Sequence, residues 1–489
     1  MESICIIGAG ISGIVAARVS LFYDLHPYIY EKNDSIGGLW SQSASQPSVW
    51  NSLTANSSKY ILAISDHPWP PNTNEFPTKS QMLEYYNSYI RKHDLHQYIS
   101  FNTTVASITR SNDKYLVTFS RNNEIFQKEF KFVICASGQY TVPNNEFKGK
   151  EVFNGEIIHA GYYREPSVFN GKKVVIVGRA VSSGDIGLEA VNNAESVTMI
   201  YRKPYVGIKK TMAGVPYDFL VSNILTRHMK APVYSTLARD SNFAKFIIQF
   251  AGNPGDVLEE WRISDEDLEK EFYKFSIHSD EYYEAIKSKQ IKCVKGNFTE
   301  FYENGVRLED GTKVPADTVI LCTGYLPNFS YLSDDIKQTL NYDAKNLRIP
   351  LTLYRSTIHP DLPGLGFVGS FYGPITGRYE FQSELSIRWM IGQLPISQEE
   401  LWEGVRLEEN GRTELKDTCF LYDLGSILQD FFRILQVNID YEFLESLGYS
   451  NGPYCPVFFW KERPGQEELI REFVREIKIE YPQFNFSNP

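Results

Sequence analysis

A glycine-rich turn near the N-terminus constrains the fold of this chain most strongly. Gly8, Gly10 and Gly13 follow a short β-prone run at residues 3 to 7 and open the helical pattern ISGIVAARVSLFYD. The next apolar run ends at Glu31, about 20 residues downstream. In this spacing the first glycine permits a tight turn, the second lets a pyrophosphate approach the backbone, and the third lets the helix pack on its strand. The pattern predicts a β-α-β dinucleotide site in which Glu31 accepts hydrogen bonds from a ribose.

The loop after Glu31 extends this site. Gly37 and Gly38 offer a second close approach of the backbone, and Leu39 and Trp40 follow them. Such a loop is typical of FAD sites in flavoproteins with two dinucleotides, although a simple turn before a buried Trp40 is an alternative. The candidate FAD-binding residues here are Gly8, Gly10, Ser12, Gly13, Glu31, Gly38, Leu39 and Trp40.

A second β-α-β unit begins at Lys172. It consists of a strand KKVVIV, a turn GRAVSSG, a helix DIGLEAVNNA and a strand SVTMIY. Two such units predict an α/β fold with two Rossmann-like dinucleotide-binding domains, each on a parallel sheet. Residues 102 to 134 and 291 to 323 alternate like antiparallel strands.

The second fingerprint departs from the glycine pattern. Gly178 is present, but Ala180 and Ser183 stand where the second and third glycines belong. The methyl group of Ala180 lies where a pyrophosphate would approach, which predicts weakened binding. Gly184 and the hydroxyl groups of Ser182 and Ser183 at a helix N-terminus are expected to compensate in part.

Arg202 follows the second unit's last strand, where the first unit has Glu31. An acid at this position suits a free ribose 2′-hydroxyl, whereas a guanidinium suits a 2′-phosphate. The pattern therefore favours NADPH over NADH. The alternative is a solvated Arg-Lys pair at an exposed strand end.

Composition excludes several classes of function. The net charge of −11 leaves no basic stripe, so nucleic acid is not an expected partner. The six cysteines are scattered without a C-x-x-C pair or histidines at ligand spacing, which indicates a reduced, cytoplasmic protein without a metal site. No run of about 18 apolar residues occurs, so no membrane span is expected.

Immediately before the second unit, the chain carries the pattern F-x-G-x-x-x-H-x-x-x-Y. Its residues are Phe153, Gly155, His159 and Tyr163. By this motif the chain resembles the flavin-containing monooxygenase family. Common Baeyer-Villiger monooxygenases carry Trp-Pro after the corresponding histidine, whereas this chain reads HAGYYREP, which favours oxygenation of nitrogen and sulfur.

Three further segments resemble the family. LTANSSKYILAISDHPWP aligns Asn56 with an asparagine that faces flavin and nicotinamide in the family. DTVILCTGYLPNFSYL retains Thr323, Gly324 and Tyr325, and GFVGSFYGPITGRYEFQSELSIRWM places Gln382 in a segment that closes over the flavin. With Gly178, Ser182, Ser183 and Arg202, these residues complete the predicted cofactor site.

The resemblance implies an NADPH domain inserted in the FAD domain. We expect residues 1 to 165 to form the first part of the FAD domain and residues 166 to 325 the NADPH domain, with a helical insert at about 205 to 280. Residues 326 to 489 would complete the FAD domain and add a C-terminal extension.

The resemblance also implies the reaction. NADPH would reduce FAD, NADP+ would stay bound, and O2 would add at flavin C4a to form a hydroperoxide that oxygenates a soft amine or sulfide. Asn56 would be the catalytic residue, placing hydroperoxide and nicotinamide by hydrogen bonds, and His159 would be structural.

Two other functions stay open. One is Baeyer-Villiger oxygenation of ketones, and the other is a flavin-binding NADPH oxidase or pseudoenzyme with weakened NADP+ retention. A disulfide reductase is disfavoured because the sequence lacks a redox dithiol. The sequence identifies neither the small-molecule substrate nor the oligomeric state, and a homodimer is left open.

Overall fold

A computed structural model describes residues 1–43, 46–225, 233–234, 236–370, 377–414, 422 and 424–487. Part of the GFVGSFYGPITG segment, residues 371–376, therefore lies outside the described residues, as does Cys419.

The first parallel sheet has the strand order β22-β7-β1-β2-β3. Its strands are β1 (Glu2–Ile7), β2 (Leu25–Tyr30), β3 (Ile99–Ser100), β7 (Phe132–Cys135) and β22 (Leu365–Phe367). The central strands are apolar and buried, as expected where helices cover both faces of a sheet. The surrounding helices are α1 (Ile11–Phe22), α2 (Lys59–Leu62), α3 (Lys79–Lys92) and α10 (Arg378–Met390).

The second parallel sheet has the order β16-β11-β10-β20-β9. Its strands are β9 (Glu156–His159), β10 (Lys173–Val177), β11 (Ser196–Tyr201), β16 (Ile291–Lys295) and β20 (Thr318–Leu321). Helices α4 (Val181–Val191) and α8 (Asp280–Lys287) pack together beside this sheet. β9 precedes residue 166, the predicted start of the NADPH domain, yet it pairs with β20.

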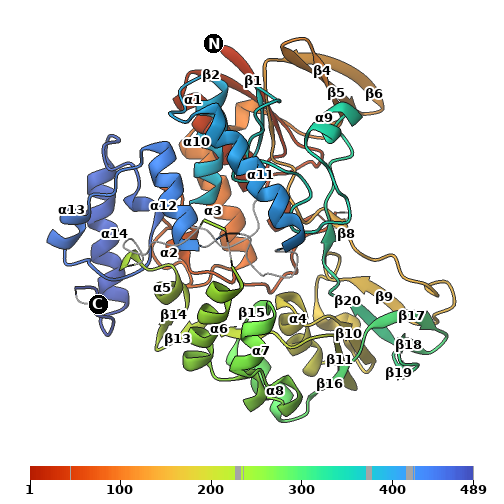
Figure 1. The fold of residues 1–489 in the computed structure, drawn as a ribbon. Coiled ribbons are helices and arrows are strands. Elements are labelled where there is room, and N and C mark those ends of the chain that lie inside the picture. The colour runs from red at the N-terminus through yellow and green to blue at the C-terminus, as the bar shows by residue number, and fades with distance from the viewer. Residues whose placement is uncertain are drawn as a thin grey trace.

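Along the chain, the segment that forms the second sheet is inserted between strands of the first sheet. The chain supplies β1, β2, β3 and β7 to the first sheet, builds the second, and returns to the first with β22. Figure 1 shows the second sheet at the lower right, apart from β1 and β2 of the first sheet near the top. This arrangement is the two-domain α/β fold that the sequence predicts.

Two three-stranded antiparallel sheets accompany the parallel ones. They are β4 (Thr104–Ser111), β5 (Lys114–Arg121) and β6 (Glu124–Phe130), and β17 (Phe298–Tyr302), β18 (Gly305–Leu308) and β19 (Lys313–Pro315). The runs that form β7, β16 and β20 were expected among antiparallel strands, and this expectation is wrong, because all three pair in parallel. Short β8 (Val142–Pro143) and β21 (Tyr325–Leu326) link the two units, and α9 (Asp334–Thr339) follows β21.

Among its described residues, the insert at 205 to 280 holds helices, as predicted, together with short strands that the sequence did not predict. Its helices are α5 (Asp218–Val221), α6 (Leu237–Ala251) and α7 (Asp265–Lys270). Its strands are β12 (Val206–Lys209), β13 (Thr211–Met212), β14 (Val215–Pro216) and β15 (Phe275–His278), and β12 pairs with the distant β15.

The C-terminal helices pack on the first unit. They are α11 (Gln398–Glu414), α12 (Leu424–Leu435), α13 (Tyr441–Ser446) and α14 (Gln466–Glu480). Phe381 of α10 stacks on Phe431 of α12 with ring centroids 5.3 Å apart, and Figure 1 shows α12, α13 and α14 together at the left. Of the helices within the described ranges, none is long and apolar enough to cross a membrane.

Candidate active site

One cavity joins the two glycine turns. Its volume of about 1410 Å³ exceeds the range of roughly 300 to 1,000 Å³ that holds a drug-sized ligand. Most of the predicted site residues line it: Gly8, Gly10, Ser12, Glu31, Gly38, Leu39, Trp40, Asn56, Gly178, Arg202, Thr323, Gly324 and Tyr325. The space therefore suits two extended ligands that meet.

The first turn is built by close backbone packing. A Cβ atom at Gly13 would lie 1.9 Å from the carbonyl oxygen of Gly8, so only glycine fits there. Gly13 supports α1 against its strand and does not line the cavity itself. Because no side chain caps α1, the N–H groups of its first turn remain for an anion.

Glu31 is held in place by N–H donors of Ala9 and Asn33. One carboxylate oxygen accepts from the Ala9 N–H at 2.8 Å, and the other accepts from Asn33 N and Nδ2 at 2.9 and 2.8 Å. The side chain is buried yet borders the cavity. Oε1 already accepts two hydrogen bonds and Oε2 accepts one, so one acceptor position on Oε2 remains for a ribose hydroxyl.

The loop after Glu31 lies against the first turn. The Gly37 N–H donates to the Ala9 carbonyl at 3.1 Å, and Gly38 starts a short 3-10 helix that ends at Trp40. Trp40 is half-buried and borders the cavity. The alternative, a simple turn before a buried Trp40, is therefore wrong, because the tryptophan is not buried.

Gln382 does not border the cavity. Its amide oxygen accepts from the Gly369 N–H at 2.9 Å, and its Nε2 donates to Ser356 O and Thr357 Oγ1, both at 3.1 Å. The side chain is fully buried and ties the segment after β22 to α10. Its contact with a cofactor would therefore be indirect, through the position of Gly369.

The second turn differs in its construction. α4 begins at Val181, so residues 181–184, predicted as part of a turn, form its first turn instead. The hydroxyl group of the buried Ser183 donates to the Ala180 carbonyl at 2.6 Å, and neither Ser182 nor Ser183 lines the cavity. These two hydroxyls are therefore not placed to meet a ligand directly, whereas Gly178 and Ala180 are.

Close packing at this helix has moved to Gly184. A Cβ atom there would lie 2.3 Å from Nδ1 of His278 in β15. Burial and the nearby charges of Arg179 and Lys210 lower the pKa of His278 to about 3, so the imidazole is neutral near pH 7. In the same turn, burial raises the pKa of Asp185 to about 6.

Arg202 follows β11 at the place where Glu31 follows β2. Its side chain is exposed and borders the cavity, while the adjacent Lys203 forms an ion pair with Glu271. The structure shows no ion pair of Arg202 within the described residues. Its guanidinium could therefore bind a phosphate without first breaking such a pair.

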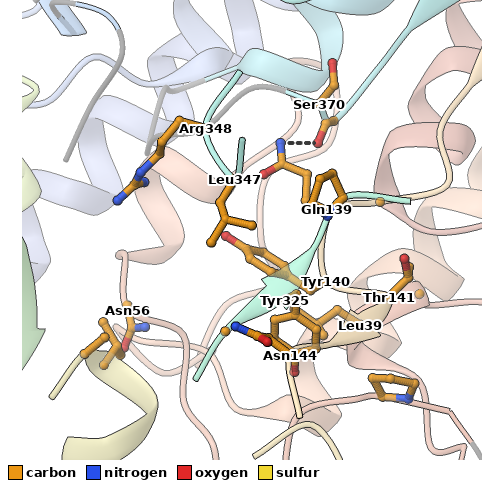
Figure 2. A pocket seen from close by; sticks show the side chains of 18 of the residues that line it. Leu39, Asn56, Gln139, Tyr140, Thr141, Asn144, Tyr325, Leu347, Arg348 and Ser370 are labelled. Atoms are coloured by element: carbon orange, nitrogen blue, oxygen red, sulfur yellow. Dashed lines mark hydrogen bonds between the residues drawn. The ribbon is translucent and has the colours of Figure 1, made fainter. Parts of the chain in front are cut away.

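Asn56 carries an unsatisfied acceptor into the cavity. Its Oδ1 atom is buried and has no hydrogen-bond partner within the part of the chain that the structure describes. Figure 2 shows Asn56 facing the same space as Leu39, Tyr325 and Arg348, which come from other segments. A buried acceptor without a donor costs free energy, so this atom fits a ligand that brings an N–H or O–H group.

The Thr323-Gly324-Tyr325 segment joins the two units. The Thr323 hydroxyl donates to the carbonyl of Asn144, whose N–H donates to the Gly324 carbonyl at 2.9 Å. Tyr140 and Tyr325 meet edge to face with centroids 5.4 Å apart, which gives the cavity an aromatic wall.

His159 organises the same junction. Its Nε2 donates to the Gly324 carbonyl at 2.9 Å, and its Nδ1 accepts from the Gly161 N–H at 3.1 Å. Burial lowers its pKa, and it does not border the main cavity. These contacts agree with a structural role.

The other residues of this motif fasten the chain to the second unit. A Cβ atom at Gly155 would lie 2.3 Å from the Asp317 carbonyl oxygen, and Phe153 packs on Phe301. The Tyr163 hydroxyl donates to Glu189 of α4. The motif therefore fixes the start of the second sheet and takes no part in the cavity wall.

Sequence reasoning missed several wall residues. Tyr140, Asn144, Leu347 and Arg348 lie in connections without a motif, and the fold alone brings them to the cavity. Arg179 also borders it, and here the sequence held a signal, a basic residue inside a glycine fingerprint.

Comparison with known proteins places the chain. The sequence profile described as flavin-binding monooxygenase-like matches residues 1–424. The Oryctolagus cuniculus protein named flavin-containing monooxygenase 5 is 29% identical over 404 residues, which cover 79% of this chain and 72% of that protein.

Solved structures share the fold. S-allyl-L-cysteine S-oxygenase from Allium sativum is 18% identical with a TM-score of 0.61, covering 100% of this chain and 95% of that one. Cyclohexanone monooxygenase from Rhodococcus sp. Phi1 bound to NADP+ is 17% identical with a TM-score of 0.63, covering 89% and 98%. The chain belongs to the flavin-binding monooxygenase-like family, whose members are NADPH-dependent oxidoreductases that bind FAD.

Proposed function

We propose that this enzyme transfers one oxygen atom from O2 to a soft nitrogen or sulfur nucleophile, using FAD and NADPH. The observation that carries the proposal is the single cavity bordered by both fingerprint turns and by the unsatisfied Oδ1 of Asn56. Two dinucleotides bound at the two turns would meet in that space, as hydride transfer requires.

The protein's residues bind, orient and exclude water. The open N-terminus of α1 and the fixed carboxylate of Glu31 would hold FAD, which together with NADPH would supply the redox chemistry. Leu39, Tyr140 and Tyr325 border the shared space and limit access of water to it. The unsatisfied Oδ1 of Asn56, which borders the same cavity, would accept a hydrogen bond from a bound cofactor and so orient it.

Asn56 gives the direct test. Asn56→Ser shortens the acceptor, and we expect FAD content to stay normal while product formation falls at least 100-fold, since one oriented donor or acceptor in such a site contributes about 3 kcal/mol. Asn74→Ser, in an exposed loop, is the matched control. Turnover of an amine or a thioether at the normal rate by Asn56→Ser would remove this residue from the mechanism.

Arg202 carries the proposed preference for NADPH. Removing its guanidinium should raise the KM for NADPH roughly 10- to 100-fold, the range of a charge-assisted contact with phosphate. The KM for NADH should stay unchanged, because NADH has no 2′-phosphate. An unchanged ratio of the two KM values in Arg202→Ala would contradict the assignment.

Two observations favour second candidates. The fold is shared with cyclohexanone monooxygenase, which supports testing ketones, although the Trp-Pro after the motif histidine is absent here. The altered second fingerprint supports testing for uncoupled oxidation of NADPH. Lactone from cyclohexanone would identify the first activity, and hydrogen peroxide equal to the NADPH consumed would identify the second.

A further inference from the structure

We propose that Arg179 binds phosphate oxygens of the pyridine dinucleotide and replaces the backbone approach lost at Ala180. The inference rests on the proposed use of NADPH and assigns a nucleotide-binding role to a residue inside the second fingerprint. The equivalent residue of the first turn is Ala9, which has no polar side chain.

The guanidinium of Arg179 is rigidly placed. Its central carbon lies 3.3 Å from the centroid of the Trp261 ring, with the Tyr201 and Tyr205 rings at 5.9 and 5.7 Å. The side chain is only 5% exposed. Stacking uses the face of the guanidinium and leaves its N–H edge for hydrogen bonds in the plane.

Part of that edge lacks acceptors in the protein. Nε and Nη1 of Arg179 are buried and have no hydrogen-bond partner within the described ranges. The polar groups that affect the pKa of Arg179 are those of Tyr282, which also hydrogen-bonds to it, Tyr283 and Cys293, and none of them is a carboxylate. A buried cation without an anion is costly, so the arrangement calls for an anionic ligand.

The surroundings favour an anion. Ala180 and Val181 border the same cavity, and no side chain caps α4, whose N-terminus carries a partial positive charge. Lys210 adds positive charge nearby, and the buried His278 stays neutral. Arg202, across the end of β11, borders the cavity as well.

Two phosphates of NADP+ share this chemistry, the 2′-phosphate and the pyrophosphate. We would titrate the oxidised FAD-bound enzyme by calorimetry with NADP+, NAD+ and 2′,5′-ADP. Arg179→Met should weaken NADP+ binding roughly 10- to 100-fold. Equal loss for NAD+ assigns the pyrophosphate, whereas loss confined to NADP+ and 2′,5′-ADP assigns the 2′-phosphate.

Arg262→Met is the matched control, because Arg262 is next to Trp261 but exposed and paired with Glu259. Should Arg179→Met not fold, Arg179→Lys keeps the charge without the planar fork, and a weaker but measurable loss of NADP+ affinity is expected. Unchanged affinity in the Arg179 variants overturns the inference, and tighter binding does so too, because the arginine would then occupy nucleotide space. A wild-type enzyme that binds no NADP+ contradicts the proposed function itself.

Discussion

The turns at Gly8 and Gly178 both lead from a parallel strand into a helix, yet they prepare for a dinucleotide in different ways. At the first turn, Gly13 packs on the Gly8 carbonyl, and the acid Glu31 comes directly after the following strand. At the second turn, the Ser183 hydroxyl donates to the Ala180 carbonyl, and Arg202 comes directly after the following strand.

A glycine motif usually serves both helix packing and ligand contact, and in the second unit these two functions lie on different residues. In the second unit the close helix contact is made by Gly184, which packs against the His278 side chain, whereas Gly13 packs against the backbone of its own turn. We propose that ligand contact in the second unit depends on two cations, Arg179 and Arg202, which border the cavity. Both turns lead into a helix whose N-terminus has no side-chain cap, and this is the feature that phosphate binding needs most.

The largest expected effect comes from the first turn. Gly13→Ala places a methyl group against the Gly8 carbonyl, and it should cost about 3 kcal/mol or more and leave protein without flavin. Flavin absorbance per mole of protein measures this. Gly10→Ala is the control, because its Cβ would meet nothing closer than 3.6 Å, so it should fold and lose only flavin affinity. Normal flavin content in Gly13→Ala would show that the close contact is not required.

The equivalent packing test in the second unit is Gly184→Ala. Its methyl group would meet the buried His278 ring, which should lower the free energy of unfolding by about 2 kcal/mol. Flavin content should remain normal, because the first turn is unchanged. Gly187→Ala in the same helix meets side chains at 3.4 Å or more and should be nearly neutral in urea unfolding. Equal stability of the two variants would contradict the packing role of Gly184.

The second unit should also respond to acid. The pKa of His278 is about 3 in the folded protein and 6.5 ordinarily, so the folded state binds fewer protons and stability falls as pH drops from 6.5 to 3. The pKa of Asp185 is raised to about 6 from 3.8, so the folded state binds more protons at this carboxyl than the unfolded state does. Protonation of Asp185 therefore stabilises the folded state as pH drops from 6 to 3.8, which opposes the loss caused by His278. The net change is therefore smaller than either contribution.

Two variants separate these contributions. Asp185→Asn should make the loss of thermal stability between pH 7 and pH 4.5 steeper, and His278→Phe, which keeps the ring that stacks on Tyr282, should make it shallower. Thermal midpoints at both pH values measure this. Parallel shifts in both variants would rule out this pair as the source.

The smallest expected effect is a repair. Ala180→Gly removes the methyl group that faces the cavity, and NADP+ should bind a few-fold tighter, a gain below about 1 kcal/mol. Calorimetry on the FAD-bound enzyme measures it. Weaker binding would mean that the loop geometry depends on alanine at this position.

Much of the parallel framework could be predicted, because buried strands read as apolar runs with turn residues at their ends. The strand at residues 196–201 matches its prediction. The start of α4 was missed because Ser182, Ser183 and Gly184 are typical turn residues, and packing against β15 decides their conformation. β6 lies in the stretch from 102 to 134 that predicted antiparallel strands, but its own bounds could not be predicted, because it is almost entirely exposed and lacks an alternating pattern.

The residues of the candidate site also fall into those that the sequence could predict and those that it could not. Glu31 and the glycines could be found because their spacing along the chain is their geometry in space. Leu347 and Arg348 could not, because they reach the cavity only through the way β22 and its preceding connection fold back on the first sheet. Arg179 carried a signal, but its ring partner Trp261 is distant in sequence, so the stacked pair needed the structure.

The central claim is that one cavity brings two dinucleotides together to oxygenate a soft nucleophile. The most direct measurement is the amount of sulfoxide and hydrogen peroxide formed per NADPH when the FAD-bound enzyme oxidises thioanisole in air. We predict close to one sulfoxide for each NADPH, with little peroxide. Consumption of NADPH matched by peroxide, without sulfoxide from thioanisole or N-oxide from N,N-dimethylaniline, would contradict the claim.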